Sequence, residues 1–265
     1  MTPNSIIDLG MIDLLAVYAF ALLSIGLGRL KGMGQGRELV FASLRMVFQL
    51  LLVGYVLKAL FAVQNPWLVL LILFGMGLFA VQTIGARVRQ RMPRFYRIVG
   101  FAVLVGCGGS TFFLCHLVIQ VEPWYDPRYL IPLAGMIIGN SMTGASLAAE
   151  RLSAEMKERG EEIEAALCLG ATAVQAARPA VENAFRAALI PTVNAMVAMG
   201  LVFLPGMMTG QILSGTEPVI AVKYQIAIMC VITGSVVLTS LVILLQGFRS
   251  YFSDAQQFLP EGRGR

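Results

Sequence analysis

Residues 66–84 read Pro-Trp-Leu-Val-Leu-Leu-Ile-Leu-Phe-Gly-Met-Gly-Leu-Phe-Ala-Val-Gln-Thr-Ile, an apolar run without a charged side chain. A helix needs roughly 20 mostly apolar residues to cross the hydrocarbon core of a bilayer. Comparable runs recur along the chain and predict about seven membrane-spanning helices, at 11–28, 39–61, 66–84, 98–121, 130–149, 187–205 and 220–246. The expected fold is therefore an all-α, multi-pass membrane protein.

Composition agrees with this interpretation. Of the 265 residues, 57% are hydrophobic and 13% are charged, whereas a soluble domain carries about 25% charged residues. The spans leave no room for a separate soluble domain, so we expect one membrane domain over residues 1–265. The net charge of +5 needs no nucleic-acid partner, because basic residues that flank membrane spans meet the anionic headgroups of membrane lipid.

The distribution of charge predicts an orientation. All but four of the 20 lysines and arginines follow the first, third, fifth and seventh spans. Because basic loops stay on the cytoplasmic side, the N-terminus is expected outside and the C-terminus in the cytoplasm. The predicted location is the inner (plasma) membrane. The basic residues that carry this prediction are Arg29, Lys31, Arg37, Arg87, Arg89, Arg91, Arg94, Arg97, Arg151, Lys157, Arg159, Arg178, Arg186, Arg249, Arg263 and Arg265.

Motifs for catalysis are absent from the sequence. The chain has no G-x-x-x-x-G-K-[ST] segment with which to hold ATP phosphates, and neither H-E-x-x-H nor G-x-S-x-G. We therefore expect that the chain is not an enzyme and binds no cofactor itself. Transport against a gradient would need ATP and Mg on a partner subunit.

The expected cytoplasmic loop at 150–178 contains a second, shorter helix. The fifth span continues past the membrane and is expected to break at Gly160, after which Glu161 and Glu162 suit the N-terminal end of a new helix dipole. Its small side chains form a narrow apolar face on which a partner protein can approach closely. The alternative, a helix lying on the lipid surface, predicts bulky aromatic residues on that face, and none occurs between 160 and 180. The predicted docking residues are Ile163, Glu164, Ala165, Ala166, Leu167 and Gly170.

The run Glu164-Ala165-Ala166-Leu167-Cys168-Leu169-Gly170 is similar to the coupling helix of ABC-transporter permeases. Several other blocks resemble FetB-type permeases: 45–50, 54–57, 139–142, 167–172, 188–194 and, above all, Gly200-Leu201-Val202-Phe203-Leu204-Pro205-Gly206-Met207-Met208-Thr209-Gly210-Gln211-Ile212-Leu213. That family is assigned to iron export with a partner ATPase, so the resemblance implies a permease subunit of an ABC exporter for a metal cation. Because alternating access uses two membrane halves and the chain shows no internal repeat, we expect a homodimer with two ATP-binding subunits.

Polar side chains inside predicted spans are candidates for the transport path, because a polar group in lipid is costly. Oxygen ligands suit hard cations, but interhelical hydrogen bonds would explain the same residues. The candidates are Asn140, Thr143, Asn194, Gln211, Arg45 and Gln49. Two further functions remain open from the residues alone, a permease for an organic solute and a membrane protein that is not a pump.

Overall fold

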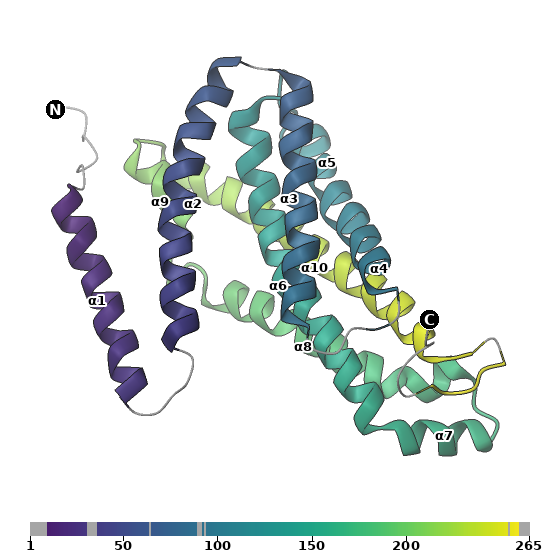
Figure 1. The fold of residues 1–265 in the computed structure, drawn as a ribbon. Helices are drawn as coiled ribbons and strands as arrows, with labels where there is room; N and C mark the ends of the chain where they lie inside the picture. The colour runs from purple at the N-terminus through teal and green to yellow at the C-terminus, as the bar shows by residue number, and fades with distance from the viewer. Residues whose placement is uncertain are drawn as a thin grey trace. The chain divides into compact units, whose positions relative to one another are not determined.

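The computed structural model describes residues 10–30, 36–63, 65–88, 92, 94–253 and 255–259. The basic residues Lys31, Arg89, Arg91, Arg263 and Arg265 lie outside the described residues. The described part is helical and contains two isolated β-bridges but no strand. Its helices are α1 (Met11–Leu30), α2 (Gly36–Val63), α3 (Pro66–Arg87), α4 (Phe95–Val103), α5 (Gly109–Phe112), α6 (Pro127–Glu158), α7 (Gly160–Cys168), α8 (Ala173–Ala198), α9 (Gly206–Leu213) and α10 (Pro218–Gly247) (Figure 1).

Five helical stretches of the described chain are long and apolar enough to cross a membrane: Gly36–Phe61, Pro66–Arg87, Phe95–Val118, Pro127–Glu158 and Pro218–Tyr251. A shorter apolar stretch, Met11–Leu27, lies on α1. The all-helical, polytopic membrane fold is therefore confirmed, while the count of seven and the orientation of the termini stay predictions.

The sixth expected span, 187–205, coincides only in part with a helix. Helix α8 begins earlier, at Ala173, because Thr172 and Gln175 form a capping box there. It ends at Ala198, and Gly200 adopts a positive φ of 82° in the turn that follows. The predicted boundary was wrong because a cap and a turn, rather than hydropathy, set the ends of this helix.

The chain divides into two compact units. One comprises residues 1–64 and 211–216, in which α1 packs against α2 and the hydroxyls of Tyr18 and Ser43 lie 3.2 Å apart. The other comprises residues 65–210 and 217–265. The second unit contains α7 and the residues around it.

Helix α6 is the centre of the second unit and packs against α3, α8 and α10. Small residues on α6 allow this close packing: Ala145, Ala148 and Ala149 are fully buried. A Cβ atom at Gly144 would lie 2.6 Å from Cγ1 of Val236 on α10. Small residues at such contacts let helix backbones approach each other in a membrane.

The stretch Phe95–Val118 is one continuous helix with two π-helical segments, η1 (Leu104–Gly108) and η2 (Phe113–Val118). Segment η1 packs against α10 at Gly106, where a Cβ atom would collide with Oγ1 of Thr239. The π-helical turns widen the helix and leave backbone carbonyls for other partners. Ser235 of α10 uses one of them, donating to the Gly106 carbonyl at 3.1 Å.

Candidate functional site

Helix α7 lies at the far end of α6, where the chain turns back into α8 (Figure 1). Its first turn carries Glu161 and Glu162, as expected for a helix N-terminus. At its other end the Gly170 amide donates to the Leu167 carbonyl and the Ala171 amide donates to the Ala166 carbonyl, both at 3.0 Å. With Gly170 at a φ of 91° this is a Schellman cap. Gly170 therefore has a local role, which is to end α7.

The predicted docking residues differ in how far their side chains are exposed to solvent. Glu164 and Ala165 are exposed, and Ala166 and Leu167 are half-buried. Ile163 is buried at 1% exposure, so its side chain packs inside this chain and is not part of the surface. Leu169, which is not among the predicted docking residues, is 90% exposed. Accessible apolar side chains thus lie at the C-terminal end of α7, at Leu169, and at the start of α8, at Val174.

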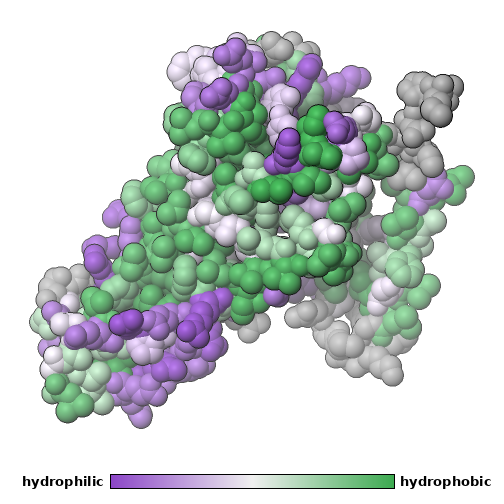
Figure 2. Space-filling model, turned by 180° about the vertical axis from the view of Figure 1, so that it is seen from behind, coloured by the Kyte–Doolittle hydropathy of each residue, from purple (hydrophilic) through white to green (hydrophobic). Residues whose placement is uncertain are grey.

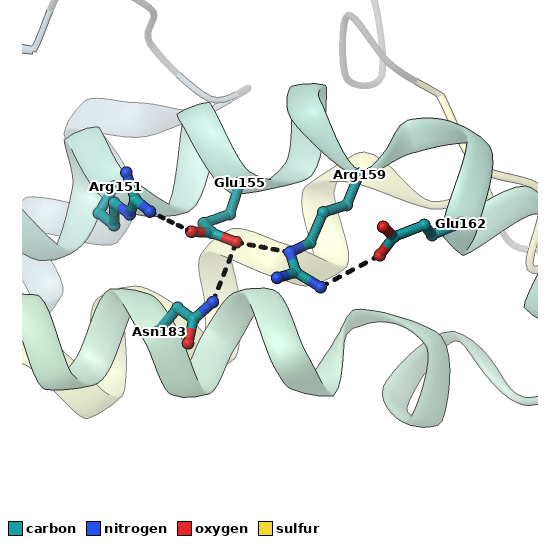
Figure 3. Close-up of polar contacts among 5 residues, drawn as sticks. All are labelled: Arg151, Glu155, Arg159, Glu162 and Asn183. Carbon is teal, nitrogen blue, oxygen red and sulfur yellow. Dashed lines mark hydrogen bonds and ion pairs between the residues drawn. The ribbon is translucent and has the colours of Figure 1, made fainter.

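A buried carboxylate connects the helices behind α7 (Figure 3). The side chain of Glu155, on the last turns of α6, is 3% exposed and accepts from Arg151 at 2.6 Å and from Arg159 at 2.7 Å. Asn183 of α8 donates to the same carboxylate at 3.2 Å. Arg159 also reaches Glu162 of α7 at 3.1 Å. These contacts join α6, α7 and α8 through one charged group.

The C-terminal segment supports the same junction. Gly160 faces the ring of Phe258, since a Cβ atom there would lie 3.3 Å from Cε1 of that ring. The Ala173 amide at the start of α8 donates to Gln256 Oε1 at 3.2 Å. A cavity of about 520 Å³ lies between the first turn of α8 and the segment 248–256. The C-terminal segment, residues 248–253 and 255–259, therefore contacts the start of α7 through Phe258 and the start of α8 through Gln256.

Hydrophilic side chains are concentrated at the ends of the view in Figure 2. One group lies at the lower end, where some hydrophobic side chains also lie, a second lies at the top, and hydrophobic side chains cover much of the surface between them. The end that carries α7 therefore presents hydrophilic side chains together with the exposed Leu169.

The predicted path residues on α6 and α8 are accessible. Asn140 is exposed and donates to the Met136 carbonyl at 2.8 Å. Thr143 donates to the Gly139 carbonyl at 3.3 Å, and Asn194 is exposed on α8. Arg45 and Gln49 are on α2, and Gln211 is on α9. The last three belong to the first unit, so the structure does not bring the six together in one described site.

Buried polar groups occur elsewhere in the bundle. Ser141 and Ser235 lie 2.8 Å apart between α6 and α10, and Cys107 and Thr239 lie 3.9 Å apart between η1 and α10. These contacts join helices tightly, as interhelical hydrogen bonds in membranes do. Among the described residues no group of three or more His, Cys, Asp or Glu side chains could hold a metal ion.

A larger cavity, of about 870 Å³, lies between α3, the 95–118 helix and α6. Its lining is apolar apart from a few groups and includes Phe74, Leu104 and Ala134. At one end His116 stacks on Phe112 with ring centroids 4.9 Å apart. An apolar cavity of this kind suits a hydrophobic molecule and not a hydrated cation.

These features define an all-helical, polytopic membrane protein with a short helix held at one polar end. The family described as "Uncharacterised protein family (UPF0014)" matches residues 11–252, and the chain belongs to this family of membrane proteins. A UPF0014 membrane protein of Synechocystis is 38% identical over 97% of this chain and 99% of the relative.

Two further relatives carry functional names. The probable iron export permease protein FetB of Escherichia coli is 33% identical over 84% of this chain and 85% of the relative. Protein ALUMINUM SENSITIVE 3 of Arabidopsis thaliana is 32% identical over 94% of this chain and 89% of the relative. No solved structure matches the chain.

Proposed function

We propose that this chain is the permease subunit of an ABC transporter that exports a metal cation, iron, across the inner membrane. ATP and Mg are bound by a separate ATPase subunit, and two copies of the chain form the membrane part, each as one domain over residues 1–265. The observation that carries the proposal is α7, a short helix with an exposed C-terminal end held on α6 and α8. The relative named as an iron export permease supports the substrate.

The expected docking surface is centred on α7 and lies on the cytoplasmic side. Its accessible members are Glu164, Ala165 and Leu169, with Ala166 and Leu167 beside them. A helix with one exposed apolar end fits a groove on a partner, where a few buried apolar anchors supply most of the binding energy. The proposed path residues are Asn140, Thr143, Asn194, Gln211, Arg45 and Gln49, of which the first four would offer side-chain oxygen atoms to a cation.

An apolar organic solute is the second candidate for the cargo. The cavity of about 870 Å³ between α3, the 95–118 helix and α6 favours it, because its lining offers apolar contacts. Loss of the chain should raise cell iron under the first proposal, and unchanged metal content would favour the organic solute.

The test is affinity purification of the chain from its own membranes, with a search for a stoichiometric ATPase subunit among the proteins that co-purify. We expect the two to co-purify, and Leu169→Glu to weaken the complex by about tenfold or more, as loss of an interface anchor worth roughly 2 kcal/mol would. Leu201→Glu is the matched control, since Leu201 is also a leucine, is 91% exposed and lies far along the chain from α7. Failure of any ATPase to co-purify with the wild type, or equal binding by the two variants, would refute docking at α7.

A further inference from the structure

The joint between α6 and α7 consists of one residue. Helix α6 ends at Glu158 and α7 begins at Gly160, with Arg159 between them at φ −99° and ψ 16°. Backbone hydrogen bonds of 2.9 Å connect Arg159 to both helices, from its amide to the Glu155 carbonyl and from the Ile163 amide to its carbonyl. The glycine beside it still permits bending that side chains must oppose. A helix that receives a push at its far end would then rotate about the joint without moving the membrane helices.

The side chains around Arg159 oppose such bending. Its guanidinium donates to Glu155 of α6 and to Glu162 of α7, so one cation contacts the helices on both sides of the joint. Glu155 is 3% exposed and Glu162 is 72% exposed, so the contact with Glu155 is the shielded one of the two. The second oxygen of the Glu155 carboxylate is occupied by Arg151, and Asn183 adds a bond from α8. Both carboxylate oxygens are thus engaged, by side chains from α6, from the joint and from α8 (Figure 3).

Burial of the Glu155 carboxylate reduces the screening of these contacts by water, while Arg151 and Arg159 are 48% and 35% exposed. The Glu155 side chain is 3% exposed, whereas the carboxylate partner of the ion pair on α8, Glu182, is 51% exposed. Exposed pairs contribute little because water and salt screen them. A buried carboxylate that loses its charge no longer balances Arg151 and Arg159, so the polar contacts across the joint depend on the charge of Glu155.

We propose that Glu155 is a positioning residue that makes α7 move as one body with α6 and α8, so that ATPase-driven motion of α7 reaches the transport path. This inference rests on the proposed function, in which α7 contacts the ATPase. Helices α6 and α8 carry Asn140 and Asn194, so the same two helices that hold Glu155 and Asn183 also carry the proposed path.

The distinguishing measurement is the amount of cargo transported per ATP hydrolysed, in vesicles that contain the complete complex. Glu155→Gln keeps the side-chain volume but places an NH2 group against an arginine. We expect the variant to bind the ATPase and hydrolyse ATP, with a transport-to-hydrolysis ratio lower by roughly fivefold or more, the range of typical coupling between sites. Glu182→Gln, which breaks the exposed pair, should leave the ratio unchanged.

Hydrogen exchange of residues 160–168 supplies a second readout on the chain itself. Glu155→Gln should raise exchange there, and Glu182→Gln should not. If Glu155→Gln cannot be purified, Asn183→Ala is measured in its place, because it removes only the α8 contact. We then expect a smaller fall in the transport-to-hydrolysis ratio.

The outcomes separate the two proposals. A wild-type chain that binds no ATPase overturns the proposed function and this coupling role together. A wild type that binds and pumps, with an unchanged ratio in Glu155→Gln or, in its absence, in Asn183→Ala, overturns the coupling role alone.

Discussion

Gly144 decides how closely α6 and α10 can pack. Val236 of α10 faces it, and the Ala188 carbonyl of α8 would lie 3.4 Å from a Cβ atom at the same position. Ser141 and Ser235 meet one turn away, at 2.8 Å. The hydrogen bond forms because the absence of a side chain at Gly144 brings the two backbones together.

At this scale we predict that Gly144→Leu destabilises the bundle. The added side chain must displace Val236 and the α8 backbone, and overpacking of this kind costs about 1–3 kcal/mol. Gly234→Leu on α10 is the control, since a Cβ atom there meets nothing within 4 Å. Thermal unfolding in detergent measures the difference, and equal midpoints for the two variants would contradict the packing argument.

Helix α7 is an element whose position is set by its neighbours. Its hydrophobic contribution to the core is Ile163, and the ring of Phe258 packs against Gly160 at its start. Phe258 is 8% exposed and belongs to an aromatic cluster with Phe252, whose ring centroid lies 5.7 Å away. The C-terminal segment therefore stabilises an element that is distant in sequence.

We predict that Phe258→Ala loosens α7. Removing a buried phenylalanine ring costs roughly 3–5 kcal/mol when the site cannot collapse, and here the loss falls on the start of α7. Hydrogen exchange at residues 160–168 should rise in this variant and stay unchanged in Phe101→Ala, because Phe101 is 50% exposed. Unaltered exchange in α7 would mean that the C-terminal segment does not support it.

For the whole molecule, the prediction from the distribution of basic residues is that α7 faces the cytoplasm. Cys168, at the end of α7, is an exposed free thiol and provides a natural probe. Helix α8 separates Cys168 from the turn at 199–205, and the prediction places these two positions on opposite faces of the membrane. Labelling both positions therefore tests both faces in one protein.

A membrane-impermeant thiol reagent should label Cys168 in inverted vesicles and not in intact cells. Cys168→Ser should remove that signal, which separates it from any reaction of the exposed Cys230. In the Cys168→Ser background, Leu201→Cys should be labelled from outside in intact cells. Labelling of Cys168 in intact cells would reverse the predicted orientation.

The apolar runs determined the helical membrane fold from sequence alone, because burial of roughly 20 apolar residues in lipid is a local requirement that each run meets by itself. Local chemistry also predicted the start of α7. Gly160 interrupts the preceding helix, and the carboxylates of Glu161 and Glu162 interact favourably with the N-terminal end of the helix dipole, both within one turn. The docking function and the orientation stay predictions.

Only the tertiary structure decided which side chains of these helices face inward. It buried Ile163, left Leu169 exposed and brought Asn183 to Glu155 across 28 residues of sequence. It also placed Phe258 against Gly160. Helical periodicity specifies which residues share a face but not what packs on that face, because the partner is chosen by contacts between elements far apart in the chain.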